Sequence, residues 1–352
     1  MASLEQPIFA SCLKSKAMEE LGVALIGCGF IGGVHLGGWK RVKGAKLVAV
    51  VDIIEGRAKR AAEDYGVPKY FTDYSKVLDM KEVDIVDVCT PTYTHAEIAV
   101  AAMKSGKHVI CEKPIALRLR EADEMINTAK KAGVKFMVAH CLRFWPEYVA
   151  AKRIVDEGTI GEPRIARAYR LSPFPEWAPW HKDRRLGGGV FVDMSIHDVD
   201  FLRWTLGEVE SVYARGGVLK TRDSTAHDYT HAVLKFKNGA IAYVEGSWIQ
   251  PPGFPFTTYL EIVGTKGMLT VDNHTTSAIR IYRPGAPPTD FTPVEEDAYY
   301  REIKHFYECV VKDEEPVVTG EEARKTLEVV LAAVKSIEEG KPVKLPLGGE
   351  VL

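Results

Sequence analysis

The segment Val23-Ala24-Leu25-Ile26-Gly27-Cys28-Gly29-Phe30-Ile31-Gly32 decides the fold of the first part of this chain. Its four apolar residues predict a buried strand, and the pattern Gly-x-Gly-x-x-Gly then opens a predicted helix. The first glycine permits a tight turn, the second lets a ligand approach the backbone, and the third lets the helix pack closely. Because the N-terminal amides of such a helix favour phosphate, the segment predicts a dinucleotide site.

A carboxylate supports this interpretation. A second apolar run, residues 47–51, is followed by Asp52, which lies twenty residues after Gly32. A carboxylate here can accept hydrogen bonds from both hydroxyls of an adenosine ribose, and it repels a 2′-phosphate. We therefore expect NAD as the cofactor, with NADP as the alternative because Arg57 and Lys59 lie nearby. The cofactor contacts expected around the turn and this carboxylate are Gly27, Gly29, Phe30, Ile31, Gly32, Asp52, Ile53 and Arg57.

Short apolar runs alternate with helical patterns between residues 21 and 140. The expected strands are 23–26, 47–51, 83–88, 108–110 and 135–138, and the expected helices are 57–65, 95–105 and 121–131. Each of these helices is followed by a glycine, namely Gly66, Gly106 or Gly133. The alternation predicts an α/β Rossmann domain with a parallel sheet and helices on both faces. Residues 1–17 show no clear periodicity, and we expect an N-terminal extension over residues 1–20.

The pattern changes after residue 140. A helix is expected to follow Trp145-Pro146, and then strands follow one another without intervening helices. Asn238-Gly239 predicts a hairpin with a type I′ turn, which needs positive φ at both residues. We expect an α+β domain over residues 141–352 with a large, mostly antiparallel sheet. Its strands are expected at 164–171, 209–216, 227–237, 240–248 and 259–263, and its closing helices at 299–312 and 321–339.

Two segments follow strands of the first domain and carry polar side chains. Thr90, Pro91 and His95 come after strand 83–88, and Glu112-Lys113-Pro114 comes after strand 108–110. Ligands of open α/β sheets bind at the carboxyl ends of the strands. We therefore expect cofactor contacts from Thr90, Pro91, His95, Glu112 and Lys113, although His95 fits a packing role equally well.

Asp193 and His197 are four residues apart on a predicted helix, which places them on one face. Asp193 can orient the imidazole and stabilise its protonated form, as a general base requires. We expect His197 to be the base and Lys113 to stabilise the developing alkoxide. The two roles are interchangeable, because a lysine beside a nicotinium cation can titrate near neutrality.

The expected catalytic residues are thus Lys113, Asp193 and His197. The same three residues are expected to bind substrate, together with Arg143 and Trp180. The proline-rich segment 172–180 is expected to form a specificity loop over this active site or over a neighbouring subunit's. No metal is expected.

Composition limits the classes of partner. The formal net charge is -2 over 352 residues, which gives no broad basic field for nucleic acid. Neither a membrane-spanning run nor a convincing signal peptide is present, so we expect a cytoplasmic protein. The six cysteines are widely spaced and are expected to be reduced thiols rather than disulfides or metal ligands.

From Val23 onward the chain resembles the glucose-fructose oxidoreductase, inositol dehydrogenase and rhizopine-catabolism family of NAD(P)-dependent dehydrogenases. The resemblance rests on the glycine turn, Thr90-Pro91 with His95, Glu112-Lys113-Pro114, residues 158–163, the Asp193 to His197 segment and the C-terminal tail. It implies a Rossmann domain, an open-faced sheet that mediates homo-oligomers such as dimers or tetramers, and a Lys-Asp-His constellation at the substrate.

The family resemblance implies oxidation of a secondary ring hydroxyl of a cyclic polyol or sugar, of inositol or pyranoside type, to a ketone. One alternative is a 3-dehydrogenase for a glycoside or nucleotide sugar. Another is a redox-assisted glycosidase that retains NAD, and a third is a ligand sensor without catalysis.

Overall fold

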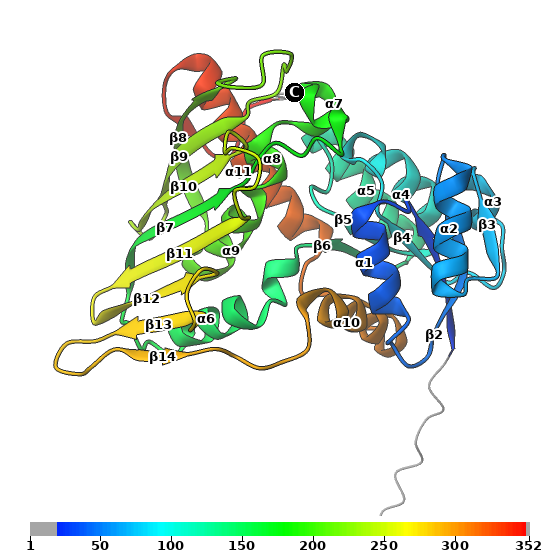
Figure 1. Ribbon diagram of the computed structural model, residues 1–352, viewed down its shortest axis with the longest axis horizontal. Coiled ribbons are helices and arrows are strands. Elements are labelled where there is room, and N and C mark those ends of the chain that lie inside the picture. The colour runs from blue at the N-terminus through cyan, green and yellow to red at the C-terminus, as the bar shows by residue number, and fades with distance from the viewer. Residues whose placement is uncertain (1–19, 350–352) are drawn as a thin grey trace, which may run out of the picture.

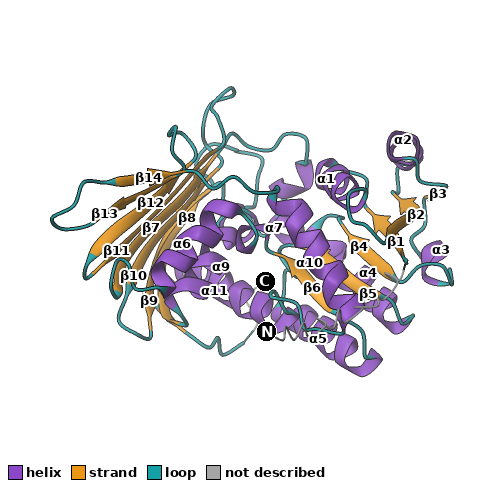
Figure 2. Ribbon diagram, turned by 90° about the horizontal axis from the view of Figure 1, so that it is seen from below, coloured by secondary structure: helices purple, strands orange, loops and turns teal. Residues whose placement is uncertain are grey.

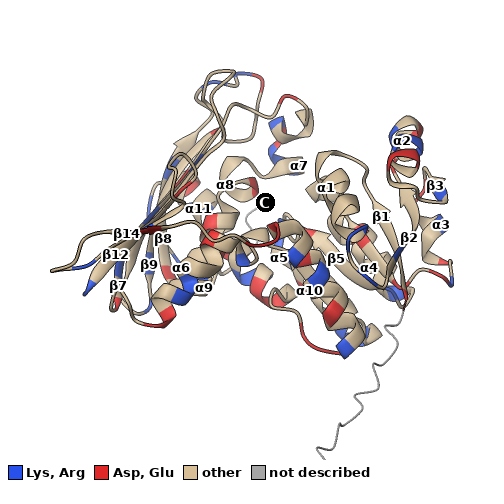
Figure 3. Ribbon diagram, turned by 60° about the horizontal axis from the view of Figure 1, so that its bottom comes forward, with Lys and Arg blue, Asp and Glu red and all other residues tan. Residues whose placement is uncertain are grey.

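A computed structural model describes residues 20–349, which form two domains packed side by side (Figure 1). Residues 1–19 of the expected N-terminal extension lie outside the described residues. Lys and Arg are interspersed with Asp and Glu over both domains (Figure 3). No helix within residues 20–349 is long and apolar enough to cross a membrane.

The first domain is built on a six-stranded parallel sheet in the order β3-β2-β1-β4-β5-β6. Its central strands are apolar because helices bury both faces of the sheet. The strand order reverses between β1 and β4, and the resulting crevice is where doubly wound sheets bind ligands. The expected Rossmann architecture is thus confirmed. The strands are β1 (Leu21–Ile26), β2 (Ala45–Val51), β3 (Lys69–Phe71), β4 (Ile85–Val88), β5 (His108–Glu112) and β6 (Phe136–Ala139).

Helices cover both faces of this sheet (Figure 2). Helix α1 packs against both α2 and α10 (Ala298–Lys312), and α5 packs against both α4 and α11 (Gly320–Glu339). Gly66 and Gly133 end α2 and α5 in the left-handed conformation, as the sequence predicts. The helices of this half of the chain are α1 (Phe30–Trp39), α2 (Glu55–Tyr65), α3 (Ser75–Leu78), α4 (His95–Lys104) and α5 (Leu119–Ala132).

The second domain contains a nine-stranded sheet in the order β14-β13-β12-β11-β7-β10-β9-β8-β15. Within residues 20–349, only the β7–β10 pair of this sheet is parallel, so the expected mostly antiparallel sheet is confirmed. Helices α6, α9 and α11 lie on one face, and the other face is open (Figure 2). The strands are β7 (Pro163–Leu171), β8 (Val209–Gly217), β9 (Tyr229–Phe236), β10 (Ile241–Ser247), β11 (Thr257–Gly264), β12 (Gly267–Asp272), β13 (Ile279–Tyr282), β14 (Thr289–Phe291) and β15 (Val343–Lys344).

The last two long helices tie the domains together. Helix α10 packs against α1 of the first domain, where the Arg41 guanidinium lies 4.0 Å from the Tyr300 ring centroid. Helix α11 packs along both α5 and β8. The remaining helices are α6 (Pro146–Asp156), α7 (Arg184–Gly187), α8 (Val190–Asp193), α9 (Ile196–Leu206), α10 (Ala298–Lys312) and α11 (Gly320–Glu339).

The β9–β10 hairpin forms, but its predicted type I′ turn is wrong. Gly239 has φ +87°, whereas Asn238 is not in the positive-φ region. The Gly239 amide donates to the Phe236 carbonyl at 3.0 Å, and the loop has three residues ending in a left-handed glycine. The Asn238 side chain bonds the Leu206 carbonyl and the Ala240 amide, and these bonds fix the longer loop.

Candidate active site

The glycine turn after β1 leaves open space for a ligand. Gly27 has φ +101°, and a Cβ there would lie 2.5 Å from the Cys89 carbonyl oxygen. A Cβ on Gly32 would lie 2.0 Å from the Gly27 carbonyl oxygen, whereas a Cβ on Gly29 would meet no heavy atom within 4 Å. The chain itself therefore requires Gly27 and Gly32. Gly29 leaves the backbone accessible, as dinucleotide binding needs.

Asp52 is held beside this turn by backbone amides. Its Oδ2 accepts from the Cys28 amide at 2.9 Å, and its Oδ1 accepts from the Ile54 amide at 2.8 Å. Each carboxylate oxygen keeps a second acceptor site, which suits the two hydroxyls of a ribose. Phe30 and Ile53 expose 72% and 88% of their surface beside it, and Arg57 is exposed on α2. These residues fit the adenosine half of NAD.

His95 ties together the loops after β4 and β5. Its Nδ1 and Nε2 lie 2.8 Å from the carbonyl oxygens of Pro114 and Thr90, respectively. The ring is buried, and both of its nitrogens are engaged by the protein. These contacts favour the alternative packing role of His95, and its expected cofactor contact stays a prediction. Thr90 and Pro91 remain partly exposed at the carboxyl end of β4.

The Glu112 side chain is buried and bonded within the protein, and its expected cofactor contact stays a prediction. Its Oε1 lies 3.2 Å from His35 Nε2, and its Oε2 accepts from the Lys113 amide at 2.9 Å. His35 Nδ1 lies 2.9 Å from Asp87 Oδ2. Burial lowers the pKa of His35, but the charge of Asp87 outweighs burial and raises it well above 6.5.

A protonated His35 thus joins helix α1 to strands β4 and β5, next to Lys113. His35 and Asp87 were not predicted from the sequence as part of this site. Asp87 lies within the apolar run 83–88, which is expected to be buried. Because buried charges are normally paired, its position indicates a buried partner for its carboxylate.

Lys113 crosses from the first domain to the second. Its Nζ lies 3.1 Å from Asp193 Oδ1 and donates to the Asp193 carbonyl oxygen at 2.8 Å. The two side chains are 17% and 20% exposed. Burial raises the pKa of Asp193, but the charges of Lys113 and His181 outweigh it, so the net shift is downward. Asp193 is therefore a carboxylate held against an ammonium group.

Asp193 and His197 do not share a helix, so that expectation is wrong. Asp193 ends α8, and His197 is the second residue of α9, with Met194 and Ser195 between the helices. Ser195 is buried against Gly246 of β10, where a Cβ would lie 2.3 Å from Ser195 Oγ. This close packing on the sheet accounts for the break.

The break changes the partner of Asp193. Its carboxylate pairs with Lys113, and within residues 20–349 it has no hydrogen bond to His197. His197 Nδ1 instead lies 3.8 Å from Cys141 Sγ. Burial lowers the pKa of His197 well below 6.5, and the charges of Lys113 and Arg170 lower it further. The imidazole is therefore neutral at pH 7, as a general base must be.

Two buried ion pairs anchor the helix that carries His197. Arg143 Nε and Nη2 each lie 2.8 Å from an oxygen of Asp200, and Arg170 Nε lies 2.9 Å from Asp198. Burial raises the pKa of Asp200, but the charges of His140 and Arg143 lower it to about 2. Arg143 is thus engaged inside the protein by Asp200, and its expected contact with substrate stays a prediction.

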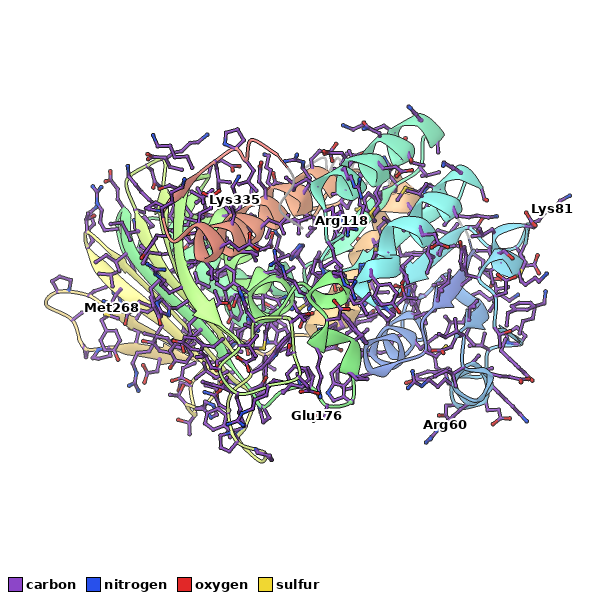
Figure 4. All side chains as sticks on the ribbon, turned by 90° about the horizontal axis from the view of Figure 1, so that it is seen from above. Arg60, Lys81, Arg118, Glu176, Met268 and Lys335 are labelled. Atoms are coloured by element: carbon purple, nitrogen blue, oxygen red, sulfur yellow. The ribbon has the colours of Figure 1, made fainter. Side chains whose placement is uncertain are left out.

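The segment after β7 reaches the first domain, where Trp180 was expected to contact substrate. The Trp180 ring centroid lies 6.5 Å from that of Tyr93, and that of Trp177 lies 6.1 Å from that of Phe30. Glu176 of the same segment lies at the junction of the two domains (Figure 4). The segment therefore borders both cofactor loops.

The fold and site define an oxidoreductase with an NAD-binding Rossmann domain, and comparison with known proteins agrees. Residues 21–140 match the family described as "Oxidoreductase family, NAD-binding Rossmann fold", and residues 148–270 match "GFO/IDH/MocA C-terminal domain". The chain belongs to the GFO/IDH/MocA family. This result confirms the family, the fold class and the enzyme class expected from the sequence.

Similar proteins include two inositol dehydrogenases. Myo-inositol 2-dehydrogenase of Thermotoga maritima is 36% identical, with 92% of this chain and 98% of the relative aligned. The scyllo-inositol 2-dehydrogenase (NAD(+)) of Bacillus subtilis is 34% identical, with 93% and 97% aligned.

Solved structures share the whole architecture. A probable dehydrogenase from Thermotoga maritima has a TM-score of 0.80 at 33% identity, covering 92% of this chain and 99% of its own. An oxidoreductase from Agrobacterium radiobacter in complex with NAD+, L-tartaric acid and magnesium has a TM-score of 0.83 at 26% identity, covering 92% and 98%.

Proposed function

We propose that this protein is an NAD-dependent dehydrogenase that oxidises the 2-hydroxyl of an inositol to a ketone. The observation that carries the proposal is the Lys113–Asp193 ion pair near a neutral His197, with Lys113 directly after the carboxyl end of β5. The names of the two inositol dehydrogenases support the substrate class. Residues 21–140 are assigned to dinucleotide binding and residues 141–352 to substrate binding and oligomerisation.

The chain supplies proton transfer and charge stabilisation. NAD+, which the glycine turn and Asp52 would hold, would supply the acceptor for the hydride of the ring carbon. His197 takes the hydroxyl proton, and its lowered pKa keeps it unprotonated and ready to do so. Lys113 donates a hydrogen bond to the developing alkoxide, while Asp193 holds the ammonium in place. The positive charge of Lys113 stabilises the oxygen most when its negative charge is largest.

Replacing Lys113 or His197 should slow the reaction without weakening cofactor binding. Lys113→Met and His197→Ala should each lower kcat by about a hundredfold or more. NADH affinity, measured by fluorescence titration, should change little, because the glycine turn and Asp52 hold the adenosine half. Unchanged turnover in either variant would remove that residue from the mechanism.

The substrate is tested by following reduced nicotinamide formation with NAD and with NADP. The panel contains myo- and scyllo-inositol, free aldoses, methyl glycosides and a nucleotide sugar. The proposal expects stoichiometric reduction of NAD by an inositol. Preferred oxidation of a glycoside or nucleotide sugar would move the assignment to a 3-dehydrogenase, and glycoside cleavage without net reduction would move it to a redox-assisted glycosidase.

We further propose a cytoplasmic homo-oligomer. The open face of the nine-stranded sheet carries exposed Ile165, Val233 and Ile241 on three neighbouring strands, as an association surface requires. The five described cysteines are free thiols, which suits a reducing compartment.

A further inference from the structure

The side chain of a buried histidine near the active site makes no hydrogen bond within residues 20–349. His181 lies in the short 3₁₀ helix Pro179–Lys182 and is only 4% exposed. Its ring centroid is 3.7 Å from that of Trp180 and 5.1 Å from that of Trp248. Among residues 20–349, Nδ1 is buried without a hydrogen-bond partner, whereas Nε2 makes no hydrogen bond but is not fully buried. Unpaired buried polar groups are rare in native proteins, and each needs a physical explanation.

The packing around the ring distinguishes its two nitrogens. Nδ1 is enclosed against Gly187, where a Cβ would lie 3.0 Å from it. Unpaired buried N–H groups are rarer than unpaired acceptors, which favours placing the proton on Nε2 and leaving Nδ1 as the enclosed acceptor. Nε2–H is then a donor that the protein does not satisfy.

The residues around His181 show where its Nε2–H group lies relative to the active site. Burial lowers the pKa of His181, Asp193 raises it and Lys113 lowers it, so both members of the catalytic ion pair act on the ring. Trp180, stacked on His181, also contacts Tyr93 of the first domain. The ring is therefore within electrostatic range of the Lys113–Asp193 pair, and its stacking partner Trp180 places it at the junction of the two domains.

We propose that His181 binds the substrate, with Nε2–H donating a hydrogen bond to a ring hydroxyl next to the one that is oxidised. This inference rests on the proposed function and deepens it, because it assigns recognition of a second hydroxyl to a named residue. A site built to bond a substrate hydroxyl rejects an analogue that lacks it, since the buried polar group then stays unpaired. The aromatic ring of Trp180 supplies an apolar wall beside that contact.

The first test compares His181→Phe with wild type and with His274→Phe. His274 is a matched control, because it lies in the exposed turn after β12, where its side chain bonds Thr257. His181→Phe should raise the KM for inositol about tenfold, the effect of one lost hydrogen bond. Its kcat should change much less, and NADH affinity and melting temperature should match wild type. His274→Phe should keep the wild-type KM.

The second test uses monodeoxy-inositols in which each ring hydroxyl is removed in turn. In wild type, loss of the hydroxyl bound by His181 should lower kcat/KM about tenfold. In His181→Phe, loss of that same hydroxyl should have no further effect, because its partner is already gone. Equal penalties in both enzymes for every analogue would overturn the proposal.

A third comparison keeps the proposal testable if the phenylalanine variant does not fold. His181→Gln can place an amide donor near the Nε2 position, whereas the shorter side chain of His181→Asn cannot. Gln should therefore retain a lower KM than Asn, and wild-type KM values in both variants would overturn the proposal. Inactive wild type with every inositol and sugar would overturn the proposed function and this inference together. Active wild type with an unchanged KM in His181→Phe would overturn this inference alone.

Discussion

At the scale of single residues, the active site depends on a lysine from one domain that reaches a carboxylate from the other. Lys113, Asp193 and His197 were identified from the sequence because a charged group after a parallel strand lies at the sheet edge. The sequence did not predict that Asp193 pairs with Lys113 instead of His197. It depends on the break between α8 and α9, which the packing of Ser195 on Gly246 imposes from a distant strand.

His197 should titrate below the ordinary histidine range. Because burial and the charge of Lys113 both lower its pKa, kcat/KM should fall only when the pH drops well below 6.5. In Lys113→Met the ring loses a neighbouring positive charge, so its pKa should rise. Histidine NMR titration of wild type and this variant measures the shift without needing turnover. An unchanged or lower pKa in Lys113→Met would contradict the proximity of the two groups.

Asp52 should set the cofactor preference. Asp52→Ser removes the charge that repels a 2′-phosphate and one ribose acceptor, so the Kd for NAD should rise about tenfold or more while that for NADP rises less or falls. Glu55→Ser, which removes a negative charge at the start of α2, is the matched control and should leave the preference unchanged. Binding titrations with NADH and NADPH check both. A wild-type preference for NADP would refute the ribose argument.

At the scale of elements, the sequence predicted most long helices and strands but not the buried contacts that hold them in place. Periodicity identifies α5 and α11 because their apolar faces are continuous, and Gly66 and Gly133 mark helix ends. It does not identify the buried partner of a charge. Arg143 was therefore assigned to substrate, although Asp200 holds it inside the protein.

Breaking the Arg143–Asp200 pair should destabilise α9. Arg143→Met leaves Asp200 buried without its bidentate partner, so the melting temperature should fall by roughly 5 °C or more. Arg280→Met removes an arginine from an exposed pair with Asp290 and should have little effect. Differential scanning fluorimetry compares the two variants. Equal melting temperatures would show that the buried pair does not anchor the helix.

At the scale of the whole molecule, α10 and α11 return from the end of the chain to pack against the first domain. The junction that brings Lys113 to Asp193 is therefore fixed by helices more than a hundred residues away in sequence. Such long-range packing is not readable from local patterns. The open sheet face is the other large-scale feature, since α6, α9 and α11 cover only one side (Figure 2).

The open face should hold the subunits together. Light scattering should show a dimer or tetramer for wild type and a smaller species for Ile241→Arg, because the charge would be buried in an apolar contact. Val294→Arg, at a residue 96% exposed in a loop, is the control and should keep the wild-type mass. A monomeric wild type would rule out this role for the sheet.

Hydride transfer from the ring carbon is the central claim, and isotope transfer tests it most directly. Inositol carrying deuterium at C2 is incubated with NAD and the protein, and the reduced cofactor is analysed by mass spectrometry. If the hydride passes from C2 to the cofactor, each NADH formed should carry one deuterium, and an equal amount of ketone product should form. Deuterium that stays in the ring or exchanges with water, without labelled NADH, would contradict it.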